Sequence, residues 1–339
     1  MTTTQSVTTT TPEPPAPPAV IAPTRRERLL SRIQNQGAIA VLVLVVVIAS
    51  IVSPGFASGA NLTSILAGNA YPALLALGMT FVIISGGIDL SVGSMFALGG
   101  VLAAYGASHG GFLLAIALPI AVAALIGLAQ GLMVAWAGMA PFIVTLAGML
   151  GARGLLQAIS HEGQTTYVVP AGSLFNKLGQ GTWPAIITVA VFFVLGGILL
   201  ARTRFGHNVF AIGGNENAAT LMGVAVRRTK VSVYVLSAVL AGVAGMLNAS
   251  QLGSGVTSIG VGYELTAIAV TVIGGTLLSG GAGSVLGTVA GVLLLAVIQN
   301  LIGQYISQYG SSASAAVNGA FLAVVVLLQT YLSRARRIT

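Results

Sequence analysis

The stretch ARTRFGHNVFAIGGNENAATLMGVAVRRTK, which runs from Ala201 to Lys230, is the longest polar interruption in the apolar part of the chain. Apolar runs lie on both sides of it, so the pattern predicts a membrane protein with one large polar loop. The stretch also carries five of the fourteen lysine and arginine residues of the chain, which are Arg202, Arg204, Arg227, Arg228 and Lys230.

A short helix is predicted in the middle of this stretch. The Gly213-Gly214 pair breaks the preceding segment, and the side chain of Asn215 is suited to accept a hydrogen bond from a first-turn N–H. Glu216 stands where the positive end of a helix favours an anion, and Gly223 is placed to end the helix. A helix of roughly two turns is marginal alone in water, so we expect it to be docked on another surface.

One face of the predicted helix is apolar. Ala218, Leu221 and Met222 share this face by their i, i+3, i+4 spacing, and Ala219 lies beside them. Such a face fits a protein partner or the lipid surface, and the helix alone does not decide between the two.

The composition of the whole chain indicates a polytopic membrane protein. Apolar residues make up 55% of it and charged residues only 6%, whereas a soluble protein has about 25% charged residues. The absence of cysteine excludes thiolate metal sites, cysteine nucleophiles and disulfides. The net charge of +8 comes from clusters at the ends of apolar runs, which is typical of the positive-inside rule rather than of nucleic-acid binding.

The chain is predicted to have three parts. Residues 1–36 form a disordered cytoplasmic tail, rich in Thr and Pro, with a basic anchor; residues 37–333 form the transmembrane domain, with the polar loop at 202–230; residues 334–339 form a basic cytoplasmic tail. The fold is expected to be all-α, with about ten spans of roughly 20 residues each. The apolar runs are 38–53, 63–85, 90–107, 112–137, 140–160, 184–201, 231–251, 264–280, 283–304 and 315–333.

Counting spans predicts the topology. Six runs separate the N-terminal bases from the polar loop, and four separate that loop from the C-terminal bases, so all three basic clusters fall on one side. That side holds twelve of the fourteen bases, which predicts that both termini are cytoplasmic. Five spans before and five after the middle would run in opposite directions, as in an inverted repeat.

Pro72 is expected to kink or break its helix. The spacing of small residues predicts close helix packing at Gly127 and Gly131 and at Gly283, Gly287 and Gly291.

Three motifs resemble one family. FAIGGNENAATLMGV at 210–224, followed by RRTK at 227–230, resembles the cytoplasmic coupling loop of the ribose/xylose-type permeases, in the branched-chain amino acid/ribose permease class. These are the membrane subunits of ABC sugar importers, and their coupling loop docks into an ATP-hydrolysing subunit. The resemblance implies that coupling in this chain is carried by Gly213, Gly214, Asn215, Glu216, Ala218, Ala219, Leu221, Met222 and Gly223.

The second motif, SGGIDLSVGSMFALGG at 85–100, resembles the family's most recognisable segment almost letter for letter. A lone carboxylate among apolar runs is expensive to bury unless it is bonded, paired or wet, so Asp89 is a candidate for the pathway or gate, together with Ser91. The alternative is that Asp89 caps the next span through N–H groups near Ser91 and Val92. The two roles are compatible if the start of that helix faces the pathway.

The third motif, Tyr263 to Thr288, departs from the family at two positions, since Thr266 stands where Asp is usual and Ala282 where Arg is common. Glu264 is retained, as a helix-end carboxylate or a substrate contact. Arg153 matches a family Arg-Gly pair and is either functional or a snorkelling arginine at a helix end.

The resemblance implies an importer permease for a monosaccharide or small polyol in the bacterial cytoplasmic membrane. Its partners would be a cytoplasmic ABC ATPase, an extracytoplasmic sugar-binding protein and a second permease subunit. No GxxxxGK[ST] motif occurs, so the chain is predicted not to be an enzyme, and ATP and Mg²⁺ would bind the partner ATPase. No metal or cofactor site is expected in this chain.

Sugars carry no charge, which agrees with a pathway of hydroxyls and amides, although polar residues in helix packing are an equal alternative. The candidates for it are Asn69, Thr145, Gln157 and Asn248. The competing hypothesis is an ion-coupled secondary transporter, which would need intramembrane carboxylates, and Asp89 alone meets that requirement.

Overall fold

The computed structural model describes residues 25–305 and, further on, residues 316, 317, 319, 320 and 323, with side chains described from residue 38. The predicted tail at 1–24, most of the last apolar run at 315–333 and the basic tail at 334–339 lie outside these residues. The described part is all-α, as predicted, apart from one isolated bridge between Val168 and Ser254. Its elements are α1 (Arg25–Val52), α2 (Gly59–Ile84), α3 (Val92–Ala135), α4 (Pro141–Ile159), α5 (Leu174–Gly179), α6 (Thr182–Arg202), α7 (Arg204–Gly214), α8 (Glu216–Leu221), α9 (Val226–Leu252), α10 (Tyr263–Ile273) and α11 (Val285–Tyr305).

Six helices of the described part, α2, α3, α4, α6, α9 and α11, are long and apolar enough to cross a membrane. The 44 residues of α3 are two helices joined at Gly111, whose φ of 71° and ψ of −156° are not helical. This break separates the predicted spans at 90–107 and 112–137. The described residues therefore confirm a polytopic helical protein, and the count of about ten spans stays a prediction.

Two apolar helices are shorter than a span, Ala38–Val52 within α1, and α10. The 11 residues of α10 cover only about 17 Å of a hydrocarbon core that is about 30 Å thick. The apolar run at 264–280 thus forms a short helix and then an irregular turn, rather than one continuous helix. By contrast, α2 continues through Pro72 without a break.

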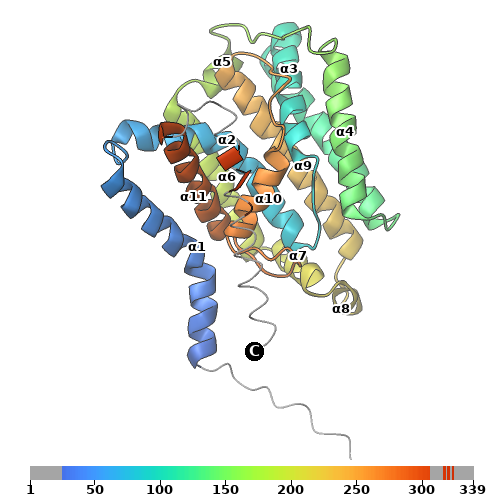
Figure 1. Cartoon of the computed structure of the whole chain (residues 1–339). Coiled ribbons are helices and arrows are strands. Elements are labelled where there is room, and N and C mark those ends of the chain that lie inside the picture. The colour runs from blue at the N-terminus through green and yellow to red at the C-terminus, as the bar shows by residue number, and fades with distance from the viewer. Residues whose placement is uncertain (1–24, 306–315, 318, 321–322, 324–339) are drawn as a thin grey trace, which may run out of the picture.

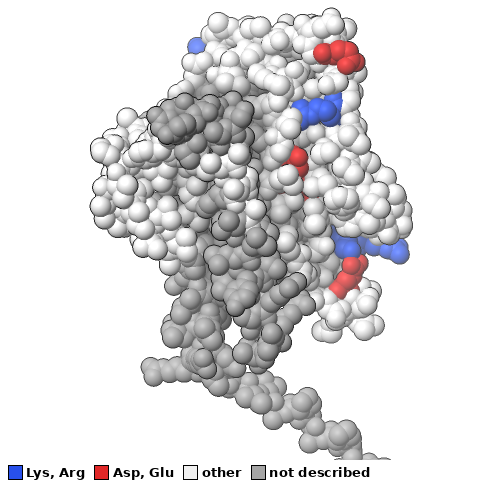
Figure 2. Space-filling view, in the orientation of Figure 1, with Lys and Arg blue, Asp and Glu red and all other residues white. Residues whose placement is uncertain are grey.

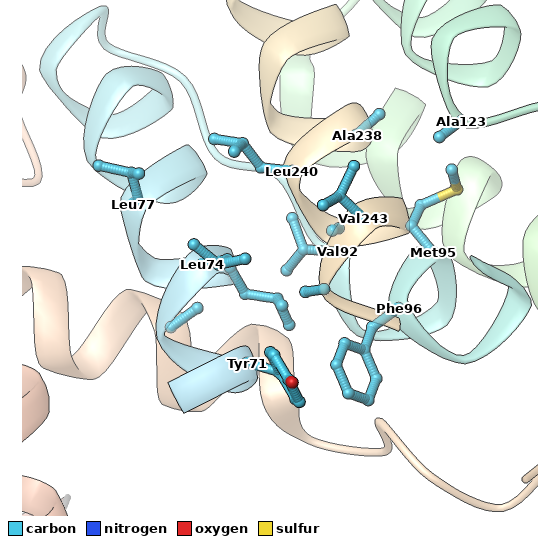
Figure 3. Packing of buried hydrophobic residues seen from close by; sticks show 14 of the residues in the cluster. Tyr71, Leu74, Leu77, Val92, Met95, Phe96, Ala123, Ala238, Leu240 and Val243 are labelled. Atoms are coloured by element: carbon cyan, nitrogen blue, oxygen red, sulfur yellow. The ribbon is translucent and has the colours of Figure 1, made fainter. Parts of the chain in front are cut away.

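The centre of the molecule is formed by α2, α3 and α9 (Figure 1). Figure 3 shows Leu74 of α2, Val92 and Phe96 of α3, and Val243 of α9 meeting in this core. A Cβ at Gly127 would lie 2.8 Å from the Tyr234 carbonyl oxygen, so the backbones of α3 and α9 touch there. The predicted close packing at this spacing is confirmed, because small residues let membrane helices approach closely.

A second backbone contact lies at the end of the molecule where Figure 1 labels α7. The end of α7, the end of α2 and the turn between α10 and α11 meet there through glycines, and a Cβ at Gly281 would lie 2.9 Å from the Gly214 Cα. The Gly281 N–H donates a hydrogen bond to the Ile84 carbonyl oxygen (2.9 Å). We call this set the glycine junction; its members are Gly86, Gly213, Gly214, Gly280 and Gly281.

Candidate functional site

The predicted short helix in the polar loop is α8. Its cap is Asn215, whose side-chain oxygen accepts a hydrogen bond from the Ala218 N–H (2.9 Å), as the sequence predicted. Gly223 follows with a φ of +80°, a left-handed conformation that suits glycine and lets the chain turn into α9. Figure 1 shows α8 projecting at the end of the molecule, beyond α7 and the start of α9.

Among the described residues, α8 packs against the rest of the chain through one buried apolar residue. Ala219 is buried against Ile212 of α7 and Val226 of α9. Leu221 and Met222 are 88% and 83% exposed, which makes them the most exposed large apolar side chains in the described part of the chain. The apolar face predicted from the sequence is therefore present, and nothing in the described part of the chain covers Leu221 and Met222.

Charges fix α8 to the next helix. The Lys230 ammonium of α9 lies 2.6 Å from the Glu216 carboxylate, and this is the one ion pair found among the described residues. Figure 2 shows basic and acidic atoms side by side at this end. The Arg227 guanidinium lies 5.0 Å from the centre of the Trp136 ring at the end of α3. These two contacts link α8 to α9, and the start of α9 to the end of α3.

The glycine junction connects this loop to the motif at 85–100. A Cβ at Gly213 would lie 2.5 Å from the Gly281 backbone nitrogen and would also collide with the Ile84 carbonyl. The ring of Phe205 in α7 stacks on Phe81 of α2 with centroids 6.1 Å apart. The helix α2 ends at Ile84, which lies at the glycine junction, and the chain then enters the segment that carries Asp89.

Asp89 is fully buried, and both of its carboxylate oxygens accept hydrogen bonds. Oδ1 accepts from the Ser91 N–H (2.9 Å) and from the Ser91 hydroxyl (2.6 Å), and Oδ2 accepts from the Ser237 hydroxyl of α9 (2.8 Å). Asp89 thus accepts from the predicted Ser91 N–H, but it stands two residues before the N-cap of α3, which is Ser91 and has no side-chain capping hydrogen bond. The bond from Ser237 adds a link to α9 that the sequence did not predict.

Other polar groups surround this carboxylate. Gln130 of α3 places its amide oxygen 3.4 Å from the Ser91 hydroxyl, and Thr145 of α4 donates to the Ile88 carbonyl (3.3 Å). Gln130 Nε2 and the Tyr234 hydroxyl are buried without a hydrogen-bond partner in the described structure. Asp89, Ser91 and Thr145 were candidates from the sequence, whereas Gln130, Tyr234 and Ser237 were missed. The only signal for Gln130 was a lone amide inside the apolar run at 112–137.

The remaining candidates lie elsewhere. Arg153 of α4 donates from Nη1 to the carbonyls of Thr257 (3.0 Å) and Ile259 (3.2 Å), so it ties down the loop between α9 and α10. Glu264 is half-buried in the first turn of α10, with its carboxylate against Gly93 of α3. In addition, Gln157 is exposed on α4 and Asn248 is half-buried on α9.

Asn69 of α2 opens onto two cavities. A cavity of about 190 Å³ lies between α2, α10 and α11, and its lining includes Asn69, Thr266 and Gln299. A larger cavity of about 540 Å³ lies between α2, α6 and α11 and is lined almost entirely by apolar side chains. In the described part of the chain no group of three or more His, Cys, Asp or Glu residues could hold a metal ion.

Comparisons with known proteins agree with the three motifs. Residues 61–330 match the family described as branched-chain amino acid transport system / permease component. The chain is 43% identical to the inner membrane ABC transporter permease protein YjfF of Escherichia coli K12, over 77% of this chain and 80% of the relative. It is 39% identical to the ribose import permease protein RbsC of Bacillus subtilis, over 87% of this chain and 92% of that protein.

A third relative is the fructose import permease protein FruG of Bifidobacterium longum, which is 33% identical over 88% of this chain and 90% of its own length. No solved structure matches the chain significantly.

Proposed function

The chain belongs to the family of branched-chain amino acid transport system permease components, and we propose that it is the permease subunit of an ATP-driven ABC importer. Its substrate would be a monosaccharide or a similar small polyol. This substrate class is supported by relatives named for the import of ribose and fructose, each covered over most of its length. The chain has no P-loop of its own, so hydrolysis of ATP with Mg²⁺ would take place in a partner subunit.

The observation that carries this proposal is the exposed apolar pair on α8. The helix α8 is capped, and its Ala219 is buried. Its Leu221 and Met222 are almost fully exposed and form an apolar surface at one end of the molecule. Apolar side chains presented in this way mark interaction sites, and burying each of them would contribute about 1.5–3 kcal/mol. We propose that this apolar surface binds the ATPase subunit.

The assembly that follows has three further parts. One ATPase would bind the coupling loop of this chain, a second permease subunit would complete the pore, and an extracytoplasmic binding protein would deliver the sugar. The loop at 202–230 would then face the cytoplasm, with both termini on the same side in the bacterial cytoplasmic membrane.

We further propose the domain division and topology that the sequence predicts. Residues 1–36 and 334–339 would be cytoplasmic tails, and 37–333 would be the permease domain with about ten spans in a 5+5 inverted repeat. The break of α3 at Gly111 supports this count, because each half of α3 would then be a crossing of its own.

The glycine junction gives a route from ATP hydrolysis to the pathway. A movement of α8 by the ATPase would reach Ile84 and the turn at 280–281 through backbone contacts, which cannot yield as flexible side chains do. The segment from Ile84 leads directly to Asp89, which is bonded to α9. We propose that Asp89 positions the start of α3 at the gate.

The test is uptake of D-ribose, D-fructose or L-arabinose into proteoliposomes that contain the complete importer. We expect uptake to require hydrolysable ATP and to survive collapse of the proton and sodium gradients, because Asp89 has both oxygens bonded within the protein. A non-hydrolysable ATP analogue is the control. Uptake driven by a gradient alone would instead establish the ion-coupled carrier.

A further inference from the structure

The cavity of about 190 Å³ between α2, α10 and α11 has a distinctive lining. Among the described residues that line it, the polar groups are all uncharged, and none is Asp, Glu, Lys or Arg. The apolar part consists of small and branched side chains, such as Ala73, Val270 and Leu295. The polar side chains are Asn69, Tyr263, Thr266 and Gln299.

Pro72 adds a backbone acceptor to this cavity. Proline has no N–H, so the ordinary helical bond to the carbonyl four residues earlier is missing, and that carbonyl belongs to Gly68. Both Pro72 and Gly68 line the cavity, and Gly68 is exposed. A proline inside a membrane helix is tolerated where another group can satisfy the freed carbonyl, and here that group would come from the cavity.

The polar side chains keep hydrogen-bonding capacity. Asn69 Nδ2 donates to the Ile65 carbonyl (3.0 Å), which leaves its amide oxygen for a ligand. The Thr266 hydroxyl donates to the Gly262 carbonyl (3.3 Å) and can still accept. Tyr263 is held by Phe96, with ring centroids 5.4 Å apart, so it supplies an amphipathic aromatic wall whose position is fixed.

We propose that this cavity is a transport-path subsite for one neutral polyhydroxylated molecule of monosaccharide size. Donors and acceptors next to an aromatic surface suit hydroxyl groups and the C–H face of a sugar ring. The volume is below the roughly 300–1,000 Å³ typical of sites for drug-sized ligands, which favours a single sugar unit. A zwitterionic amino acid would bring two charges to a wall whose described residues carry no charged side chain, so this lining favours a sugar among the substrates of the family.

The proposal rests on the proposed import function, and the absence of cysteine from the chain allows a direct test. A single thiol is introduced as Gly68→Cys, where a Cβ meets no atom within 4 Å, and separately as Thr266→Cys on the opposite wall. The matched control is Gly154→Cys on α4, where a Cβ is equally free and which lies outside the cavity. The reagent is 2-(trimethylammonium)ethyl methanethiosulfonate, and dithiothreitol reverses it.

Each variant is compared with itself before and after the reagent, in proteoliposomes with the complete importer. We expect modification at position 68 or 266 to lower sugar uptake by about tenfold or more, and modification at 154 to change it by less than about twofold. The transported sugar should slow labelling at 68 and 266 but not at 154. Leucine serves as the zwitterionic competitor and should protect neither site.

The outcomes distinguish a failure of the proposed import function from a failure of the subsite alone. If the unsubstituted importer takes up none of the three sugars with ATP, both the function and the subsite are wrong. If it transports sugar while labelling at 68 and 266 neither blocks uptake nor is slowed by that sugar, the subsite alone is wrong. Protection by leucine instead of sugar would overturn the substrate class.

Discussion

Two segments of this molecule share a short Gly-Gly-x-acid pattern and have opposite surroundings. The segment at 85–91 and the segment at 213–223 each contain a Gly-Gly pair followed by one carboxylate, and both meet at the glycine junction. In the first, Asp89 is fully buried and all its bonds are made within the chain. In the second, Glu216 is exposed, and so are Leu221 and Met222.

The difference lies in how each segment offsets an unfavourable exposure or burial. Burying a carboxylate is unfavourable unless hydrogen bonds compensate, and the bonds of Asp89 do so while linking the start of α3 to α9, a contact that we call the internal joint. Exposing large apolar side chains is also unfavourable, and nothing in the described chain compensates for it at α8. The bonds of Asp89 are therefore satisfied within the chain, whereas under the proposed function a partner subunit would cover the apolar face of α8.

The largest effect is expected at the contact between the two segments. Gly213→Ala would place a methyl group against the Ile84 carbonyl and the Gly281 nitrogen, and backbone cannot move aside as a flexible side chain can. We expect a loss of about 3 kcal/mol, at the upper end for overpacking. The thermal unfolding midpoint of the detergent-solubilised permease measures this loss.

The adjacent residue supplies the control. Gly214→Ala is the same change on the next residue, where a Cβ meets no atom within 4 Å, and it should alter stability by less than about 0.5 kcal/mol. If both variants unfold at the same temperature, the glycine junction does not join the two segments.

The next effect concerns the internal joint. Asp89→Leu removes the acceptor of the Ser91 N–H and of two hydroxyls. The Ser237 hydroxyl can rotate to a backbone carbonyl of α9, and the Ser91 hydroxyl has the Gln130 amide oxygen 3.4 Å away, so the main loss is one unsatisfied N–H, about 2 kcal/mol. Asp89→Asn and Asp89→Ser keep an acceptor and should retain most transport and stability.

Thermal midpoints and uptake are measured for all three variants. An Asp89→Asn permease that folds and assembles normally but does not transport would show that the charge itself is needed, and the capping interpretation would fail.

The sequence predicted the features that depend on near neighbours. The Asn215 cap, the turn at Gly223 and the bond from Ser91 to Asp89 each involve residues at most three positions apart or a single backbone angle. The close packing at Gly127 and Gly131 was also predictable, because small residues at that spacing have one main use in a membrane.

Features that depend on distant residues could not be predicted. Ser237 lies 148 positions from Asp89 along the chain, and no local pattern marks it as a partner of that carboxylate. The sequence grouped Ala218 with Leu221 and Met222, but only the packing of α7 and α9 shows that Ala219 is the residue that faces inward. The apolar run at 264–280 likewise hid the early end of α10, because hydropathy does not register where a helix stops.

The smallest effect on the fold, and the sharpest test of the comparison, is expected at α8. Leu221→Ala with Met222→Ala removes two side chains that touch little of their own chain, and alanine favours helix, so stability should stay unchanged. Affinity for the ATPase subunit should fall by about tenfold or more, which corresponds to about 1.4 kcal/mol.

Leu113→Ala is the control. Leu113 is 77% exposed and lies just after the break of α3 at Gly111, away from α8 in the chain. ATPase co-purification and affinity are compared in one detergent. An affinity that the double variant leaves intact, with weaker attachment to lipid, would make α8 a lipid-surface helix and remove the contrast between the two segments.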